Sequence, residues 1–579
     1  MSLQRHYGVN EQLERIANAI AMGNAGTSAV VLDETFEAMV NGENTSSLFH
    51  RWWALAMELD NNTSNRYAIL DRWFALLGRA WSDKYYTIRF NDYRVSSSSE
   101  GTPMGDLAGK AAAMCATEQS ANTAEWCDED PMTWYVRFNA LSLADGTMNV
   151  VAVEGVDDSF DITGNAAPVY TGSLALWLTQ YTDGTYEYKT FTTEHVGGAH
   201  PLACDVAPDG SHRHMSWHAT FGGSLTSGGK LTSGSGYHGM TWERNSNTPA
   251  WREGATTGLT NARKWDSYEG VYSDTDLDHL LNMWQLRHFS LENSGVIEGC
   301  LSNNYQYTVA MAEEDVTSFL LTTAQAANLV VGDCVEIGSH PEGTNNDRNT
   351  AANYDLVSCA VITEIETVTI DGTDYARVHL DITTAVDIPA TGYVSTMPWV
   401  PGSTEHLPGR KDGSLYNCTN GKTPARIAGI EIIDGAYALG LDPLWNSDWD
   451  DTRDPKSIYT VYQCRNSEKQ GGSITSDYES VGTFSSPASG WQYIKHFEIR
   501  DDGMMMPDAL GASSTTYLRS AFSFHGSSGV RAPWRFCSLV NDALGGLAGA
   551  NGYSTPSDAS WNGRPRLSGS GKKRGEWAA

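Results

Sequence analysis

The sequence predicts an α+β protein of several domains, with a helical start and a β-rich remainder. At 579 residues the chain is too long for one ordinary core, since domains average about 150 residues. Apolar residues recur at helical spacing near the start, whereas from Tyr85 onward they alternate with a period of two. The 56 glycines, together with many Ser, Thr, Asn and Asp residues, supply turns for many short strands.

Residues 1–83 are predicted to be helical. Leu48 and Trp52 share one helical face, and Ile69 and Trp73 share another. Two interpretations fit these aromatic stripes. They dock the chain onto a larger assembly, or they only pack the helices against each other.

Residues 84–200 are predicted to form a β-rich domain. Apolar and polar residues alternate in YYTIRF, MNVVAV, LALWLTQY and YEYKTF. Clusters of Gly, Asp, Asn and Ser separate these runs, so each run is expected to be one strand.

A helix is expected within residues 201–308, in the stretch TDLDHLLNMWQLRHF. Thr275 or Asp274 is suited to cap its N-terminus, because a side-chain oxygen there can accept a bond from a free backbone amide. The apolar residues spaced between Leu277 and Trp284 are expected to form its single apolar face.

Residues 309–397 are predicted to form a small β-barrel or sandwich. VGDCVEIG supplies one strand, and CAVITEIETVTIDGTDYARVHLDI supplies two more. A hairpin turn at Asp371-Gly372 joins these two, because glycine adopts the required positive φ without strain. Pro398 marks the exit from this unit, and residues 398–579 continue with short strands and glycine-rich loops.

The formal net charge of −31 argues against general affinity for nucleic acid or an anionic membrane, which carry charge of the same sign. Only the basic end at Lys572–Arg574 departs from this balance, as expected of a solvated tail. The nine cysteines include no C-x-x-C pair, so neither a disulfide scaffold nor structural zinc is predicted.

The sequence also lacks targeting and membrane signals. Its first residues contain no apolar signal-peptide core, and the chain has no apolar run of about 18 residues. We therefore expect a soluble protein that is made in a cytoplasm and does not insert into a membrane.

The densest group of reactive side chains lies between His195 and His218. His212, His214 and His218 could bind one metal ion together with Asp205, in the manner of a metallohydrolase. Their spacing matches no specific zinc signature such as H-E-x-x-H. Ordinary hydrogen bonding is the prediction, with no metal and no cofactor.

Two other patterns fall short of an enzyme signature. GGSLTSGGKL resembles a phosphate-binding loop, but Ser224 replaces its first glycine and Leu231 replaces the residue that would hold magnesium. Adjacent carboxylates that could cleave sugars arise by chance among 70 acidic residues: Glu313 and Glu314; Asp448, Asp450 and Asp451; Asp501 and Asp502. No catalytic residue is predicted.

The C-terminal part resembles a known family. SSGVRAPWRFCSLVNDALGGLAGANGYSTPSDASWNGRPRLSGSGKKRGEW is similar to the variable region of C-type-lectin-fold proteins targeted by diversity-generating retroelements. This family includes the major-tropism-determinant-like receptor-binding proteins of phages. QYIKHFEIRDDGMMMPDALGASSTTYLRSAFSF and YTVYQCRNS resemble virion proteins from phages of gut bacteria. The likeness runs from roughly Ile427 to the C-terminus and extends to Trp265–Tyr307.

The resemblance implies a fold and a role. Residues 201–308 and 398–579 would form one C-type-lectin-like domain, similar to formylglycine-generating enzymes, with residues 309–397 inserted. The chain would be a virion protein, non-enzymatic and homotrimeric. It would bind a glycan or protein receptor on the bacterial surface and contact other virion proteins through its N-terminus. Its role would be attachment to the host, whether it sits on the tail or on the head of the virion.

The resemblance also implies a variable region at about 528–567. Adenine-directed mutagenesis of an Asn codon yields Asn, Asp, Tyr, Ser, Thr, Ala, Val or Leu codons, and these types lie between the glycines. The expected ligand-binding positions are Val540, Asn541, Asp542, Ala543, Leu544, Asn551, Tyr553, Ser554, Asp558, Ser560 and Asn562. Replacing them is expected to leave the fold intact.

The scaffold beneath these positions is expected to consist of large anchors and tight glycines. The anchors are Trp534, Phe536, Trp561 and Leu567, and the glycines are Gly545, Gly546, Gly549 and Gly552. Three alternatives stay open. The segment is an ordinary glycine-rich loop, the chain is a glycan-degrading virion enzyme, or it is a fixed capsid decoration protein.

Overall fold

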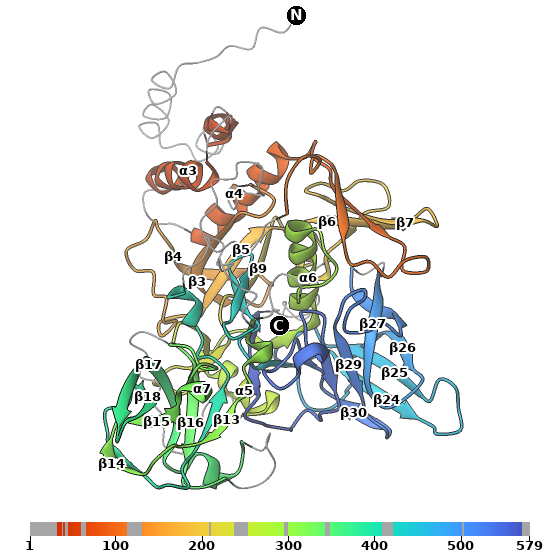
Figure 1. The fold of residues 1–579 in the computed structure, drawn as a ribbon. Coiled ribbons are helices and arrows are strands. Elements are labelled where there is room, and N and C mark those ends of the chain that lie inside the picture. Colours follow the sequence, from red (N-terminus) through yellow and green to blue (C-terminus); the bar gives the residue numbers. More distant parts are fainter. Residues whose placement is uncertain are drawn as a thin grey trace, which may run out of the picture.

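The computed structural model describes the chain apart from residues 1–31, 38, 41–43, 60–64, 113–129, 208–209, 237–252, 295–298, 342–347, 408–420, 501–502 and 570–579. Helices account for 18% and strands for 39% of the structure, and the strands form several sheets (Figure 1). The α+β prediction is therefore confirmed. The basic end Lys572–Arg574 and the pair Asp501 and Asp502 lie outside the described residues.

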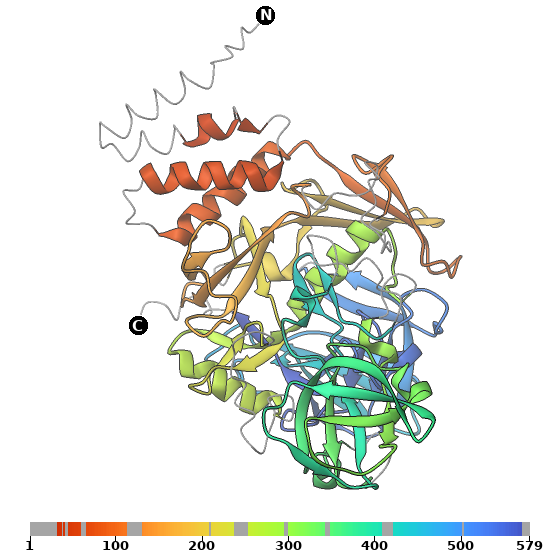
Figure 2. The ribbon, with the colours of Figure 1, turned by 60° about the vertical axis from the view of Figure 1, so that its left-hand side comes forward.

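Two helices, α3 (Thr45–Leu59) and α4 (Arg66–Ala80), confirm the helical prediction for most of the described part of residues 1–83. Asn65 caps α4, because its side chain accepts a hydrogen bond from the amide of Ala68. Figure 2 shows both helices at one end of the molecule, where α4 contacts the sheet that contains β4, β5 and β9.

The aromatic stripes of these helices face inward. Trp52 and Trp73 are fully buried, with 5.6 Å between their ring centroids. Phe49 lies 5.2 Å from Trp73, and Trp134, beyond the helices, lies 5.7 Å from Trp73. The stripes therefore pack the helices, and the expectation that they form an exposed docking surface is wrong for these side chains.

Two sheets follow α4. One has the strand order β2-β1-β7-β6-β8 and the other β4-β3-β5-β9. Their strands are β1 (Tyr86–Asn91), β2 (Gly101–Gly105), β3 (Tyr135–Ser142), β4 (Met148–Val153), β5 (Val169–Leu174), β6 (Trp177–Thr182), β7 (Tyr186–Thr192), β8 (His200–Pro201) and β9 (Met215–Ala219). Because β9 pairs with β5, the second sheet continues beyond residue 200, where the sequence placed a boundary.

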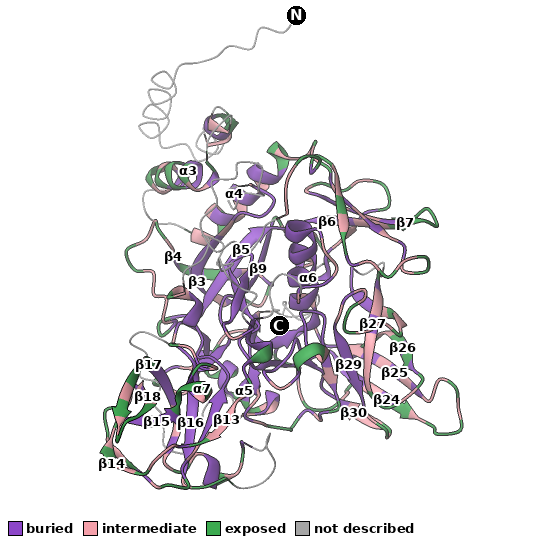
Figure 3. Cartoon of the chain, viewed as in Figure 1, coloured by how far each residue is buried: buried purple, intermediate pink, exposed green. Residues whose placement is uncertain are grey.

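Helix α6 (Asp274–His288) runs through the centre of the molecule (Figures 1 and 3). Its cap is Ser273, whose side chain accepts a hydrogen bond from the Thr275 amide, and Asp276 completes a capping box. The predicted cap at Thr275 or Asp274 is therefore wrong by one or two residues. Helix α5 (Ala255–Ala262) and strands β10 (Gly223–Leu225), β11 (Leu231–Ser233) and β12 (Glu269–Ser273) precede it.

Helix α6 is buried on all sides, beyond the one apolar face that the sequence predicted. Every one of its residues except Thr275 is buried, and several polar ones bond to different sheets. Gln285 accepts a bond from Lys189 at 2.9 Å, and Asp278 accepts one from the Met505 amide at 3.1 Å. Buried polar groups require such partners, so α6 ties the β7 sheet to the C-terminal strands.

The segment 309–397 folds into small sheets with a hydrophobic core of their own. The strand orders are β13-β20-β16-β17-β18-β15 and β14-β19. The elements are β13 (Gln306–Thr308), β14 (Glu313–Val316), β15 (Ser318–Thr322), α7 (Thr323–Ala326), β16 (Cys334–Gly338), β17 (Val357–Ile370), β18 (Thr373–Leu380), β19 (Val386–Ile388) and β20 (Tyr393–Met397). Asp371 and Gly372 both have positive φ, 50° and 75°, which confirms the predicted hairpin turn.

The C-terminal strands form a nine-stranded sheet, β28-β27-β29-β32-β31-β23-β12-β34 with β33 beside β23, and a second sheet, β26-β25-β24-β30. Their bounds are β21 (Ala425–Ile427), β22 (Ile430–Ile432), β23 (Tyr437–Asp442), β24 (Leu444–Trp449), β25 (Ser457–Gln463), β26 (Glu479–Ser486), β27 (Gly490–Ile499), β28 (Met505–Leu510), β29 (Ala521–Phe524), β30 (Gly529–Arg531), β31 (Trp534–Arg535), β32 (Ala550–Gly552), β33 (Gly563–Pro565) and β34 (Leu567–Gly569).

Strands from both sides of the small sheets share this nine-stranded sheet. β12 pairs in parallel with β23 and antiparallel with β34. One hydrophobic cluster also extends from Phe36 in the N-terminal region to Leu567 near the C-terminus. Among the described residues, the predicted segments other than 309–397 thus contribute to a common core.

Candidate ligand-binding face

Four neighbouring strands, β27, β29, β32 and β31, build one continuous surface in the C-terminal sheet. Trp491 pairs with Ser523, Ser523 with Asn551, and Asn551 with Trp534. Because side chains alternate between the two sides of a strand, these four point to the same side of the sheet. Trp491 and Asn551 are half-buried there, whereas Ser523 and Trp534 are buried.

The opposite side of the same strands packs into the core. Phe522 and Ala550 are fully buried, and the indole of Trp445 lies 5.5 Å from the Phe522 ring. Arg535 places its guanidinium 5.1 Å from the Phe522 ring centroid and 2.7 Å from a carboxylate oxygen of Asp274 in α6. Burial of this kind holds the backbone of the outer surface rigid.

The predicted anchors are buried, as expected. Trp534, Phe536, Trp561 and Leu567 are each 5% exposed or less. The glycines between them allow close approach of the backbone. A Cβ at Gly549 would lie 2.4 Å from the Phe536 carbonyl oxygen, which is a severe clash.

The remaining predicted glycines are equally confined. A Cβ at Gly552 would lie 2.6 Å from the Trp445 ring, one at Gly545 2.8 Å from the Cys537 Cβ, and one at Gly546 2.1 Å from the Ser520 hydroxyl. Gly546 also has φ of 154°, a backbone conformation that side chains rarely adopt. These glycines are therefore part of the scaffold.

The eleven predicted ligand-binding positions divide by exposure. Asp542, Ala543, Tyr553 and Asp558 are exposed; Val540, Leu544, Asn551, Ser560 and Asn562 are half-buried; Asn541 and Ser554 are buried. The prediction that Asn541 and Ser554 are displayed is therefore wrong, because both are buried. Ligand binding by the other nine residues stays a prediction.

Asn541 is buried because it holds a turn together. Its side-chain oxygen accepts hydrogen bonds from the Ser538 amide at 2.7 Å and the Ser538 hydroxyl at 3.1 Å. Ser554 is fixed by its backbone, whose carbonyl accepts a bond from the Ala532 amide at 3.0 Å. Local composition did not reveal these roles, since Asn and Ser are equally common in exposed loops.

Several exposed and half-buried positions are held by local bonds. The Asn551 side chain accepts a bond from the Tyr553 amide at 2.9 Å, and Asp558 accepts two from Thr555. Asn562 donates to the Ser538 hydroxyl at 3.2 Å. These bonds set the direction of each side chain before any ligand arrives, which lowers the entropy cost of binding.

Residues outside the predicted segment complete the surface. The His525 ring lies 4.0 Å from the Tyr553 ring, and the Tyr493 hydroxyl donates to the Ala543 carbonyl at 2.9 Å. We define the candidate face as Trp491, Tyr493, His525, Asp542, Ala543, Asn551 and Tyr553. The alternation of WQY was a usable signal for Trp491 and Tyr493, but nothing in the sequence linked them to Tyr553.

The candidate face combines aromatic rings with polar groups. Tyr553 is 55% exposed, one of the most exposed large side chains among the described residues. Partial burial and the nearby Arg531 lower the pKa of His525, so its imidazole is neutral at neutral pH. Asp542 then carries the one formal charge of this face. Such a surface suits stacking and hydrogen bonding to a neutral or cationic ligand.

The predicted histidine group does not converge on one metal ion. His212 stacks on Trp177 at 4.5 Å, His214 lies 3.3 Å from Asp71, and His218 lies 2.6 Å from Asp276. The three imidazoles therefore contact different parts of the fold. His195 packs edge-on against Trp177.

One buried group among the described residues brings metal-binding atoms together. Ligand atoms of Cys204, His218 and His279 lie within 4.8 Å of one another. The two imidazoles stack with centroids 4.1 Å apart and only 24° between their planes. A metal ion binds in the plane of each imidazole, so nearly parallel rings do not direct both nitrogens at one ion.

The other enzyme-like patterns also have structural explanations. Part of GGSLTSGGKL is a hairpin of β10 and β11, with Gly229 in a turn at φ of 69°. Asp450 accepts two bonds from Thr452 in an exposed turn, and Glu313 pairs with Arg377 at 2.8 Å. Asp450 and Glu313 are therefore held by ordinary structural contacts.

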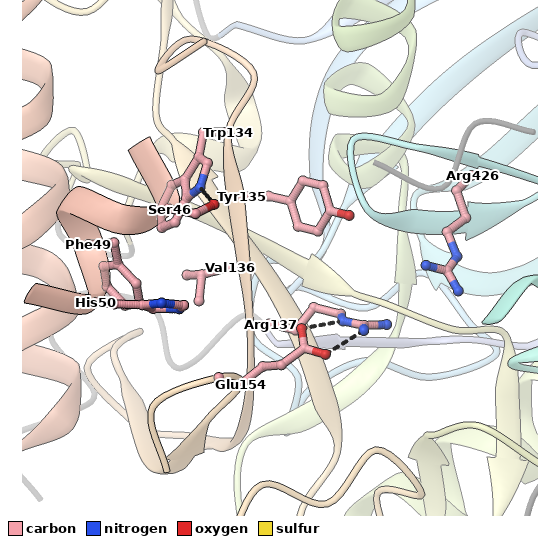
Figure 4. A pocket seen from close by; sticks show the side chains of 10 residues that line it. Ser46, Phe49, His50, Trp134, Tyr135, Val136, Arg137, Glu154 and Arg426 are labelled. Carbon is pink, nitrogen blue, oxygen red and sulfur yellow. Dashed lines mark hydrogen bonds and ion pairs between the residues drawn. The ribbon is translucent and has the colours of Figure 1, made fainter. Parts of the chain in front are cut away.

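A pocket of about 280 Å³ lies between α3, β3, β4 and the β21 hairpin (Figure 4). Trp134 and Tyr135 line it, together with Arg137 and Arg426. Arg137 bonds to Glu154 and lies 2.6 Å from Glu405, which also pairs with Arg426. These cations are neutralised within the protein, so the pocket has no excess charge to attract an ion.

Within the part of the chain that the structure describes, no helix has both the length and the apolar character needed to cross a membrane. No protein-family model matches the chain, and no curated protein matches it significantly. The candidate face is therefore identified from the geometry of the structure alone.

Proposed function

We propose that the chain is a structural protein of a phage virion and that the candidate face binds a glycan or protein receptor on the bacterial host. The observation that carries this proposal is the contrast between the two sides of the sheet at β27 and β32. One side packs Ile494 and Ala550 into the core, whereas the other carries the half-buried Trp491, Tyr493 and Asn551 and leads to the exposed Tyr553. Exposed aromatic and polar groups on a rigid frame are typical of binding sites.

The same contrast supports the proposal that residues of the candidate face can be exchanged without loss of the fold. Tyr553 contacts the His525 ring but contributes no side chain to the core, and Ala543 is exposed. Substitution at such positions usually changes stability by about 0.5 kcal/mol or less. The chain can therefore change ligand without changing fold, which is the property that a diversified receptor-binding protein needs.

In this proposal the nine-stranded sheet is the body of a C-type-lectin-like domain, and residues 309–397 are an insertion. Strand β12 would supply the part that precedes the insertion. A homotrimer would present three faces to a cell surface, and linked sites raise overall avidity without new contacts.

Diversification makes a prediction about the coding DNA. A near-repeat of the DNA for residues 528–567, differing only at adenines and lying beside a reverse transcriptase gene, is expected. The Asn541 and Ser554 codons should be spared, because both side chains are buried. The lack of a repeat would favour a fixed adhesin or capsid decoration protein.

A glycan-degrading enzyme is the weaker alternative. Asp448, an exposed residue of β24, pairs with Arg453 at 2.7 Å. Burial raises the pKa of Cys537 to about 12, which keeps its thiol protonated and unreactive. Neither of these two residues thus favours catalysis over binding.

Adsorption of the purified full-length chain to host cells tests the proposal. The variant is Tyr553→Ala with Asp542→Asn, since Asn tolerates the positive φ of 43° at position 542. The matched control is Tyr181→Ala, which removes an equally exposed tyrosine stacked on Tyr188 at 4.9 Å in a different sheet. We expect adsorption to fall about tenfold or more in the variant alone, at unchanged melting temperature. Equal adsorption by all three proteins would overturn the proposal.

A further inference from the structure

Two cysteines that the proposed function does not use lie side by side in the small sheet. The sulfur atoms of Cys334 and Cys359 are 2.7 Å apart. Ordinary non-bonded contacts between heavy atoms are about 3.5 to 4.0 Å, whereas a disulfide bond is about 2.05 Å. We propose that Cys334 and Cys359 form a reversible disulfide that fixes the segment in contact with Ser560 and Trp561, at the end of the proposed variable segment.

The strand pairing explains the proximity. Cys334 in β16 pairs with Val361 in β17, and Cys359 lies two residues from Val361, on the same side of its strand. The pairing shifts between Val335 and Ile337, opposite the stretch that contains Cys359. A shift of this kind re-aims the side chains of the longer strand, here toward Cys334.

The surroundings allow oxidation from one side. Cys334 is fully buried, whereas Cys359 is half-buried and reachable from solvent. A small disulfide such as oxidised glutathione can therefore meet Cys359 first. The sequence predicted no disulfide scaffold, and a single cross-link within one hairpin is compatible with that expectation.

The reaction is two successive thiol–disulfide exchanges. The Cys359 thiol loses its proton and its sulfur attacks oxidised glutathione, which forms a mixed disulfide and releases one glutathione thiolate. The Cys334 sulfur, also deprotonated, then attacks the Cys359 sulfur and releases the second glutathione thiolate. Each leaving thiolate takes up one proton. The two protein thiols are oxidised, and one glutathione disulfide is reduced to two thiols.

The loop that this bond closes touches the end of the proposed variable segment. Arg348 lies in it and places its guanidinium 4.3 Å from the centroid of the Trp561 ring. Its neighbour Asn349 accepts a bond from the Trp561 amide at 3.0 Å and donates to the Ser560 hydroxyl at 3.3 Å. A closed loop has fewer open conformations, so oxidation should hold these contacts more firmly.

The cysteines and Trp561 also share a hydrophobic cluster. Met397, Leu539 and Trp561 pack with Cys334, and Cys359 lies against the same group. The cross-link would therefore form inside the contact between the small sheet and the C-terminal segment. Its formation does not depend on what the candidate face binds.

Thiol counting on the full-length chain tests the bond. The reduced protein is incubated with oxidised glutathione, unfolded and alkylated with iodoacetamide, and its mass is measured. We expect two fewer alkylated cysteines than the nine in the chain, a cross-linked peptide containing Cys334 and Cys359, and full reversal by dithiothreitol. Alkylation of all nine, or a glutathione adduct that persists on Cys359, would overturn the proposal.

Variants separate this pair from the other thiols. Cys359→Ser and Cys359→Ala should retain every remaining thiol after oxidation, whereas the control Cys464→Ala should still lose two. Hydrogen exchange of the peptide containing the Trp561 amide measures the link to the variable segment. We expect slower exchange in the oxidised wild type than in the reduced form, and no difference in Cys359→Ser. Equal exchange in both wild-type forms would overturn the link to the variable segment, whatever the adsorption experiment gives.

Discussion

The imidazole of His525 packs against the phenol ring of Tyr553, with 4.0 Å between the two ring centroids and 49° between their planes. The two residues lie on different segments of the chain. His525 directly follows β29, whereas Tyr553 directly follows β32, and these strands are parallel neighbours in the sheet. The two rings therefore meet at the C-terminal ends of these two strands, where the Tyr553 ring is exposed to solvent.

Replacing Tyr553 with Ala should weaken receptor binding and leave folding intact. A central exposed aromatic commonly contributes about 1 to 2 kcal/mol per site, which is about a 5- to 30-fold loss in affinity. The melting temperature should change little, because the side chain has no buried contact. Titration of labelled protein on host cells measures the affinity, and Tyr553→Phe should retain most of it. A Tyr553→Ala protein that unfolds early would show that this ring is scaffold.

Replacing Trp561 with Ala should have the opposite effect on folding, because it should destabilise the protein. Trp561 is 2% exposed and lies beneath the Arg348 guanidinium, so its removal should cost about 3 to 5 kcal/mol of unfolding free energy. Denaturant unfolding, with Tyr553→Ala as the comparison, measures this cost. Equal midpoints for the two variants would mean that the anchor role of Trp561 is wrong.

Asn541→Ala should destabilise the protein, although the sequence placed Asn541 among the displayed positions. The substitution removes the acceptor for the Ser538 amide in a buried turn, and an unpaired buried donor costs about 1 to 3 kcal/mol. Ala543→Ser, at an exposed position in the same loop, is the matched control and should melt like the wild type. If both variants melt normally, Asn541 returns to the set of candidate ligand contacts.

Stability should fall as the pH rises toward 9, because of His496. Its imidazole lies 2.8 Å from Glu187 and 2.5 Å from Asp508, and these carboxylates outweigh burial and raise its pKa to about 9. The unfolded chain has an ordinary pKa of about 6.5. The folded state binds the proton more tightly, so the contribution is complete below pH 6.5 and lost by about pH 9.

Unfolding free energies measured from pH 6 to 10 check this dependence. The loss should be up to about 3 kcal/mol, less whatever solvent screening removes from this partly exposed group. His496→Gln should be less stable than the wild type at pH 6 and should vary less with pH. A wild-type profile that rises from pH 6.5 to 9 has the opposite sign and would contradict the assignment.

Deleting residues 1–83 should give an insoluble product. The deletion removes Trp52 and Trp73, and it exposes Trp134, which is 4% exposed in the full chain. Exposed apolar patches of this kind promote aggregation. Sedimentation of the expressed protein measures the outcome. A soluble, folded fragment would restore the interpretation of these helices as a separate docking element.

Treatment with EDTA should leave the melting temperature unchanged. The stacked rings of His218 and His279 do not direct their nitrogens at one ion, and burial lowers the pKa of His279 and raises that of Cys204. Both groups are therefore neutral, whereas a zinc site requires a thiolate. Elemental analysis that finds zinc at one atom per chain would refute this expectation.

The sequence by itself determined the features that depend on near neighbours. Helical spacing predicted α3 and α4, and the Asp371-Gly372 pair predicted a turn, because backbone preferences act over a few residues. Large aromatic residues such as Trp561 were correctly expected to be buried, since removing them from water is favourable in almost any fold.

Only the tertiary structure decided which polar residues are buried and which distant segments meet. Asn541 and Tyr553 are both ordinary loop residues by composition, yet one bonds to Ser538 inside a turn and the other is exposed. The sequence predicted only the apolar face of α6, but its polar residue Gln285 is also buried and accepts a hydrogen bond from Lys189. Burial of a polar group is favourable only when a partner is present, and strand pairing across hundreds of residues supplies that partner.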